Sequence, residues 1–351
     1  MYPIYGLGYL KICLTYLSWI TTLRRILAIK LSLDPRQWFK KEEAKPEGVV
    51  GVACCESGIA ICYGTFNDGD YQIESCEYAP LPPSEQLSYM KGWVVRHKLK
   101  NADCHYVLNE KDYELQLLEA PPVEKSELHE AVRWRLKDLI SSPVEDVVLD
   151  VVALPDDAYR GRMKMLYAVV SNKEAVESVI SFIEKSELVP VVVDIPEMVL
   201  RNVALYIPEM DYGTTALLKM EETSGAMLMY SHDALYLTRQ IEFGYSSFAT
   251  TPGAFALDND VMVDRLGLDL QRSLDYYESQ LGKGVANKIY ILPFEDDDVH
   301  FADDLQKTLQ TPILHFDCRE FLPFSESVNP SIKEQAFCMP AIGAVLRRQE
   351  L

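Results

Sequence analysis

Short runs of apolar residues separated by turn residues fill residues 49–108, and they recur in the second half of the chain. Three such runs predict three short strands. The turn at Asn67–Asp70 is typical of a β-hairpin. An amphipathic helix and another strand follow. The predicted elements are strands at 49–54, 59–66 and 71–78, a helix at 84–99 and a strand at 104–108.

Residues 215–292 repeat this order of elements. Apolar residues at helical spacing, from Leu266 through Leu274 and Tyr277 to Leu281, predict the buried side of a long helix. A β-β-β-α-β unit that occurs twice favours two similar α/β domains. The predicted elements are strands at 215–220, 226–230 and 234–241, a helix at 261–281 and a strand at 288–292.

A separate segment lies between the two repeats. It starts with an amphipathic helix at 127–140, for which Ser126 is the expected N-cap, and Ser141-Ser142-Pro143 should end it. We expect Leu128, Ala131, Val132, Leu136, Leu139 and Ile140 to form its buried stripe. A hairpin, a second helix, a strand and a third helix follow. Their predicted bounds are 147–154 and 163–170 for the hairpin, 173–186, 188–193 and 197–206.

The net charge of −19 over 351 residues limits which kinds of molecule are expected to bind this protein. Such a surface repels phosphate backbones, so we expect no nucleic-acid partner, and it favours basic peptides. Eight cysteines occur without CxxC spacing or a nearby histidine, which indicates reduced thiols in a cytoplasm rather than a metal site. We therefore expect no bound metal.

The first 33 residues differ from the rest. Residues 4–23 are largely apolar but contain Lys11, and Arg24, Arg25 and Lys30 follow. A membrane span, an interfacial amphipathic helix and a start codon assigned too early all fit this pattern. We expect this extension to be dispensable for folding, because composition changes abruptly there and the first predicted strand starts at Val49.

The segment from Glu127 to Asp194 resembles the insertion subdomain of the PilM family, the actin-like proteins of type IV pilus assembly. The likeness is greatest to its branch for mannose-sensitive haemagglutinin (MSHA) pili. Residues 271–277 and 341–347 also resemble family helices. The resemblance implies an actin-like (ribonuclease H-like, duplicated) α/β fold of two domains, the first carrying an inserted α+β subdomain. The implied division is an extension at 1–45, a first domain at 46–108 and 188–210, an insertion at 109–187 and a second domain at 211–351.

The nucleotide motifs of actin-like ATPases are degraded here. Ala53 stands where the metal-organising Asp is expected, and Cys55 where Gly would let the backbone approach phosphate. The segment Asp211–Thr215 has the pattern of a phosphate-binding motif, but it comes before the predicted strand at 215–220, whereas the motif should follow that strand. The turn that does follow the strand begins at Met220-Glu221-Glu222. An acidic loop at 291–298 replaces the Gly pair of the adenosine pocket. We expect no catalytic residue and no cofactor.

The resemblance implies a cytoplasmic scaffold, peripheral to the inner membrane, that binds the cytoplasmic tail of an inner-membrane pilus assembly protein and meets other assembly components. In the family, the tail lies in a groove between the first domain and the insertion. Trp134, Arg135 and Leu136 are the candidates to line that groove. Homo-oligomerisation stays open. The alternative is an actin-like ATPase or kinase with atypical phosphate loops.

Overall fold

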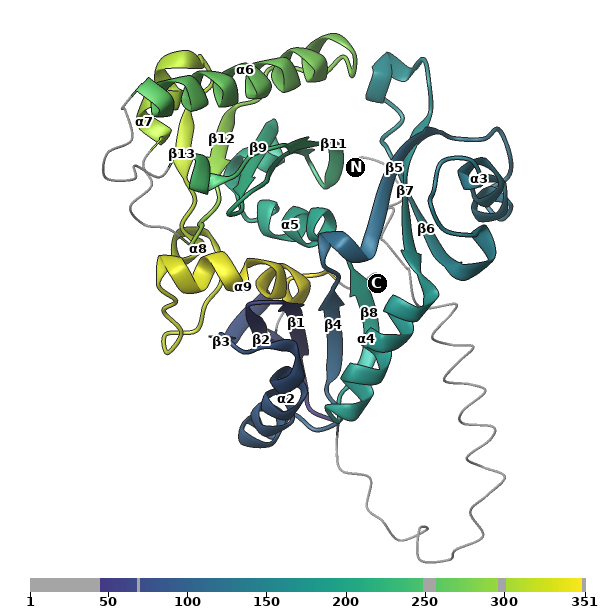
Figure 1. Cartoon of the computed structure of the whole chain (residues 1–351), viewed down its shortest axis with the longest axis vertical. Helices are drawn as coiled ribbons and strands as arrows, with labels where there is room; N and C mark the ends of the chain where they lie inside the picture. The colour runs from purple at the N-terminus through teal and green to yellow at the C-terminus, as the bar shows by residue number, and fades with distance from the viewer. Residues whose placement is uncertain (1–44, 68–69, 249–256, 296–300, 349–351) are drawn as a thin grey trace, which may run out of the picture.

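The computed structural model describes residues 45–67, 70–248, 257–295 and 301–348 (Figure 1). The predicted extension at 1–45 lies almost wholly outside them. The first sheet has five strands in the order β3-β2-β1-β4-β8. Strands β1, β2 and β3 form an antiparallel meander, and β4 and β8 extend it in parallel. The bounds are β1 Val49–Cys55, β2 Gly58–Asn67, β3 Asp70–Ala79, α2 Pro83–His97, β4 Asp103–Val107 and β8 Val189–Asp194.

The second sheet has the same design, in the order β11-β10-β9-β12-β13. The recurrence predicted from the sequence is therefore confirmed strand by strand. Both β9 and β10 are almost completely buried, which explains why they read as continuous apolar runs rather than as alternating ones. The bounds are β9 Thr214–Met220, β10 Gly225–Ser231, β11 Ala234–Ile241, α6 Leu257–Ser279, β12 Lys288–Ile291, α7 Ala302–Thr308, β13 Ile313–His315, α8 Cys318–Phe321 and α9 Ile332–Val345.

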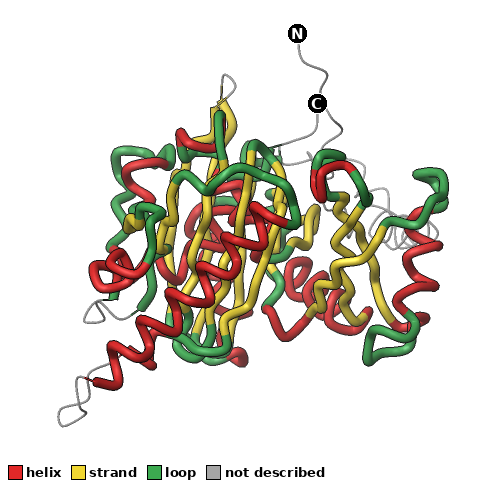
Figure 2. The backbone as a smooth tube through the Cα atoms, turned by 90° about the horizontal axis from the view of Figure 1, so that it is seen from above, coloured by secondary structure: helices red, strands yellow, loops and turns green. Residues whose placement is uncertain are grey.

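The insertion follows β4 and contains its own three-stranded sheet, in the order β5-β7-β6. The hairpin of β6 (Val147–Ala153) and β7 (Met165–Asn172) was predicted, whereas the outer strand β5 (Tyr113–Glu119) was not. Helix α3 (Leu128–Leu136) covers one face of this sheet. Seen from above, the insertion is a separate group of strands beside the main body (Figure 2). Short 3-10 turns occur at 110–112, 144–146, 158–161, 208–211 and 245–248.

Helix α3 is shorter than predicted. It ends at Leu136 rather than near residue 140, its N-cap is Glu127, and no side chain caps it, so the expected Ser126 cap is wrong. Val132 and Leu136 are buried as expected, but Leu139 is 52% exposed because it lies beyond the end of the helix.

Helix α4 (Lys173–Lys185) belongs structurally to the first sheet. Its apolar side chains Val176, Ile180 and Ile183 join the main core, not the small core under α3. In chain order, α4 directly precedes β8, the last strand of the first sheet, just as α7 directly precedes β13, the last strand of the second sheet. The sheet of the insertion thus ends with β7 at Asn172, before the predicted boundary at 187.

The two halves exchange helices. Helix α5 (Pro196–Ala204) follows the first sheet and packs against β10 and β11 of the second, where Tyr230 donates a hydrogen bond to the Glu197 carbonyl (2.7 Å). Helix α9, at the end of the second half, packs on β1 and β2 of the first sheet. The predicted second domain at 211–351 therefore contains a helix that completes the first sheet.

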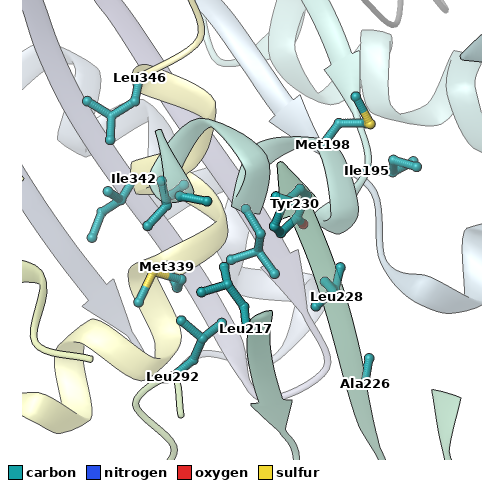
Figure 3. Packing of buried hydrophobic residues seen from close by; sticks show 14 of the residues in the cluster. Ile195, Met198, Leu217, Ala226, Leu228, Tyr230, Leu292, Met339, Ile342 and Leu346 are labelled. Carbon is teal, nitrogen blue, oxygen red and sulfur yellow. The ribbon is translucent and has the colours of Figure 1, made fainter. Parts of the chain in front are cut away.

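Close approach of α9 requires glycine. A Cβ on Gly51 of β1 would lie 2.2 Å from the Ala341 carbonyl oxygen, and one on Gly343 of α9 would lie 2.3 Å from the carbonyl oxygen of Val199 in α5. Figure 3 shows the core that results, in which α5, α9 and the second sheet meet. The labelled members are Ile195, Met198, Leu217, Ala226, Leu228, Tyr230, Leu292, Met339, Ile342 and Leu346.

None of the helices in the described part of the chain combines the length and the apolar character that crossing a membrane requires.

Candidate functional site

The two turns that carry the phosphate motifs in actin-like ATPases join β1 to β2 and β9 to β10. In the first turn, the Cys55 thiol donates a hydrogen bond to the carbonyl of Gly58 (3.4 Å) and lies 3.1 Å from the Ser57 hydroxyl. Ala53 is inside β1, paired with Ala60 and Val107, and its methyl group packs against the core, so it offers no ligand for a metal ion. The motif positions 53 and 55 thus carry a methyl group and a thiol instead of a carboxylate and a glycine.

Ion pairs within the chain connect these two turns. Glu110 and Lys111 lie in the 3-10 turn after β4. Lys111 pairs with Glu56 of the first turn. Lys219, near the end of β9, pairs with Glu110 (2.7 Å) and with Glu221 of the second turn (2.5 Å). We call these five residues the turn cluster.

Electrostatics hold Lys219 to its carboxylates. Its side chain is only 19% exposed. Burial alone would lower the pKa of Lys219, but the carboxylates of Glu110 and Glu221 raise it above its ordinary value. The charge that could attract a phosphate is therefore already neutralised, and a phosphate would also approach Glu56 and Glu222.

Aromatic rings fill the region after β12, where the adenosine pocket of ATP-binding relatives is expected. Phe294 stacks on Tyr245 (centroids 5.5 Å apart) and on Phe301 (5.8 Å), and Phe248 stacks on Phe301 (4.6 Å). The Tyr245 amide also donates to the Glu221 carbonyl (2.8 Å), which ties these rings to the second turn. The rest of the predicted acidic loop, from residue 296, lies outside the described residues.

A pocket of about 290 Å³ separates the insertion from the second sheet. Leu115 and Leu117 of β5 form one wall and Leu237 of β11 forms another. Glu197 lies at this pocket, where Tyr113 donates a hydrogen bond to its carboxylate (2.7 Å) and burial raises its pKa. Both β5 and β11 are outer strands of their sheets. Thr238, Arg239 and Gln240 also line the pocket, so it is a cleft with both apolar and polar walls.

The three residues predicted to contact a partner do not share one surface. Trp134 is 67% exposed and Arg135 is exposed, with its guanidinium donating to the Glu119 carbonyl (2.7 Å). Leu136 is 1% exposed and lies in the core under α3, so the expectation that it faces a groove is corrected: at helical spacing, residues 134 and 136 point in different directions.

The position of α3 also differs from the expectation. Its buried residues contact only other parts of the insertion. In Figure 1, α3 lies at the outer end of the insertion, with the strands β5, β7 and β6 between it and the first sheet. Trp134 is exposed on this helix, whose buried side chains pack within the insertion.

Sequence reasoning missed the turn cluster. Lys219 did carry a signal, since it is a lone basic residue in the apolar strand Thr214–Met220. Glu110 and Lys111 directly follow β4, but only the fold shows that this point lies beside both turns.

No protein-family model and no curated protein sequence matches the chain. Among solved structures, the chain is similar to a PilM-PilN type IV pilus biogenesis complex, with a TM-score of 0.65 and 19% identity, over 87% of this chain and 100% of that one. A second match is the cytoplasmic domain of EpsL, an inner-membrane component of the type II secretion system of Vibrio cholerae (TM-score 0.43, 13% identity, 82% and 92% covered). The third is a Bacteroides thetaiotaomicron protein with an actin-like ATPase fold (0.45, 8%, 78% and 91%). The predicted actin-like fold is confirmed.

Proposed function

We propose that this protein is a cytoplasmic scaffold of type IV pilus biogenesis, peripheral to the inner membrane, that binds the cytoplasmic tail of an inner-membrane assembly partner. The observation that carries the proposal is its likeness to the PilM-PilN complex over nearly the whole chain. The amino-acid sequence of residues 127–194 supports the finer assignment to the MSHA branch of the family, to which MshI belongs.

The exposed face of α3 offers an aromatic anchor for a peptide tail. Trp134 is a large apolar side chain with Glu130 one turn before it and Lys137 and Asp138 one turn after it, all exposed. Carboxylates attract and steer a positively charged peptide, while burial of the indole ring prolongs the complex.

Titration with a fluorescently labelled tail peptide tests this role. Trp134→Ala should weaken binding by about 2 kcal/mol or more, because aromatic anchors dominate such interfaces. Arg272→Ala is the control: Arg272 is exposed on α6 of the other half and pairs only loosely with Asp269 (3.4 Å). It should leave binding unchanged, and circular dichroism should show that both variants are folded.

Other outcomes of this titration would place the tail-binding site elsewhere on the protein. If folded Trp134→Ala binds normally and Leu117→Arg does not, the tail occupies the pocket between the insertion and the second sheet. If Arg272→Ala alone abolishes binding, the site lies on the second half, and the role of the insertion is refuted.

The turn cluster favours a scaffold over the alternative, an actin-like ATPase or kinase. Binding of Mg-ATP would have to break the ion pairs of Lys219 with Glu110 and Glu221 and bring a triphosphate close to Glu56. We therefore expect calorimetry with Mg-ATP to detect no micromolar binding. A Mg²⁺-dependent dissociation constant in that range would support the enzyme.

A further inference from the structure

Three cysteine thiols converge where α9 covers the first sheet. Cys62 of β2 and Cys76 of β3 are direct cross-strand partners, and their sulfur atoms lie 3.2 Å apart. Cys338 comes from α9, and the three Sγ atoms all lie within 4.8 Å of one another. We call these residues the thiol cluster.

Packing around the thiol cluster fixes its geometry. Cys62 and Cys338 are fully buried, and Cys76 is half-buried. Beside them, the ring of Tyr78 on β3 stacks on that of Phe337 on α9, with centroids 3.9 Å apart and planes within 4°. This stack holds α9 in one register over β3, so the three sulfurs are presented from two strands and a helix without a flexible loop.

The spacing of the sulfurs fits a bound metal ion. Thiolates coordinate Zn²⁺ at about 2.3 Å, so that sulfurs on a tetrahedral ion lie roughly 3.8 Å apart. The distances in the thiol cluster, from 3.2 Å to at most 4.8 Å, bracket this value. Small side-chain rotations would therefore complete the site.

Access to the thiol cluster comes from the surface. A hollow of about 320 Å³ is lined by Cys76 together with Ser75, Ser327 and Asn329. Glu334 also lines it, but its carboxylate accepts from the amide and hydroxyl of Ser331 (2.8 Å each), so it is engaged in capping α9. The hollow gives an ion a path to Cys76 and gives water a path to the open fourth position.

We propose that Cys62, Cys76 and Cys338 bind one Zn²⁺ ion, with a solvent molecule as the fourth ligand. Soft thiolate donors select such ions over Mg²⁺ or Ca²⁺. Each thiol releases its proton to solvent when its sulfur coordinates the ion. A disulfide would use only two of the three sulfurs, whereas the ion uses all of them. Bound Zn²⁺ would link α9, the last helix of the second half, to β2 and β3 of the first sheet.

Titration of the reduced, metal-free full chain with Zn²⁺ against a chromophoric chelator tests the proposal. We expect one ion per chain, a raised melting temperature, and a sulfur-to-metal charge-transfer band when Co²⁺ replaces Zn²⁺. Cys76→Ser and Cys338→Ser should each lose the band and the rise in melting temperature. Because Cys76 is half-buried, its variant is the one least expected to disturb folding.

Cys318→Ser is the matched control. Cys318 is also a buried thiol near α9, 3.9 Å from the Met339 sulfur, but it is not part of the thiol cluster. It should keep the band. The proposal is overturned if the wild-type chain binds no Zn²⁺, if Cys318→Ser loses binding as Cys76→Ser does, or if folded Cys76→Ser binds like wild type.

Discussion

At the scale of single residues, His105 connects the first sheet to the end of α9. It is 5% exposed on β4, and its Nδ1 lies 2.8 Å from the Ala344 carbonyl oxygen, to which it donates in the neutral tautomer. Burial lowers the pKa of His105 to about 4, and the positive charge of Arg347 acts in the same direction, against the carboxylates of Asp194 and Asp103. The neutral ring is thus the form that the fold accepts.

This pKa predicts a loss of stability in mild acid. A histidine has a pKa near 6.5 in the unfolded chain, so below that pH the unfolded state binds a proton that folded His105 refuses. The contribution of His105 to the free energy of unfolding is therefore present in full above pH 6.5 and is lost as the pH falls toward 4. At pH 5 the loss should be about 2 kcal/mol.

Urea unfolding at pH 7 and pH 5 measures this effect. His105→Asn keeps a donor near the position of Nδ1 but cannot titrate, so its free energy of unfolding should fall less between the two pH values than that of the wild type. Equal losses in both proteins would show that other groups account for the acid sensitivity.

Residue types alone placed Trp134 outside the buried stripe of its helix, in agreement with its 67% exposure, but they did not predict the thiol cluster. Leu136 was expected both in the buried stripe and in the groove, and only its burial is confirmed. Cys62, Cys76 and Cys338 are far apart in sequence, and only strand pairing and the return of α9 bring them together.

At the scale of elements, the sequence predicted most strands and helices well, since burial imposes a clear period on them. Strand β5 was missed, although its residues Tyr113, Leu115 and Leu117 alternate with polar ones. Helix α3 was predicted too long because Leu139 and Ile140 continue its apolar spacing, while the chain has already left the helix after Leu136. Periodicity detects an element better than it detects where the element ends.

The contact of α9 with β1 leads to a prediction for two glycines. Gly51→Ala should destabilise the protein by about 1–3 kcal/mol, because the new methyl group would meet the Ala341 carbonyl and the neighbouring Val345 side chain. Gly92, exposed inside α2, has nothing within 4 Å of its missing Cβ. Gly92→Ala should stabilise by up to about 1 kcal/mol, because alanine favours the helix.

Melting temperatures of the two variants and the wild type check this pair. The expected order is Gly92→Ala above wild type above Gly51→Ala. A Gly51→Ala variant as stable as wild type would mean that α9 can move away from the sheet at little cost, which would contradict the close packing of this helix.

At the scale of the whole molecule, the sequence predicted two repeated halves but not their exchange of helices. Pattern and resemblance show which elements recur, whereas the sheet on which a helix packs depends on contacts between distant segments. Each half therefore depends on the other for part of its core: α5 closes the second sheet and α9 closes the first.

Such an exchange predicts that the two halves unfold together. Arg347, just after α9, pairs with Asp194 at the end of β8, and both side chains are almost fully buried (10% and 1% exposed). Arg347→Ala should cost roughly 3–5 kcal/mol, because it leaves a buried carboxylate without its partner. If the halves are one cooperative unit, the slowest-exchanging amides of β2 and of β10 should lose hydrogen-exchange protection by the same factor.

The control for this experiment is Lys307→Ala, which removes a solvent-exposed pair with Asp304 and should change protection in neither sheet. If the Arg347→Ala variant loses hydrogen-exchange protection only in β2, the second half keeps its structure without the first. The exchange of helices would then not couple the stability of the two halves. Equal loss in both sheets would mean that a change at α9 acts on the whole molecule. The Zn²⁺ ion proposed at Cys338 of α9 should then raise protection in both sheets as well.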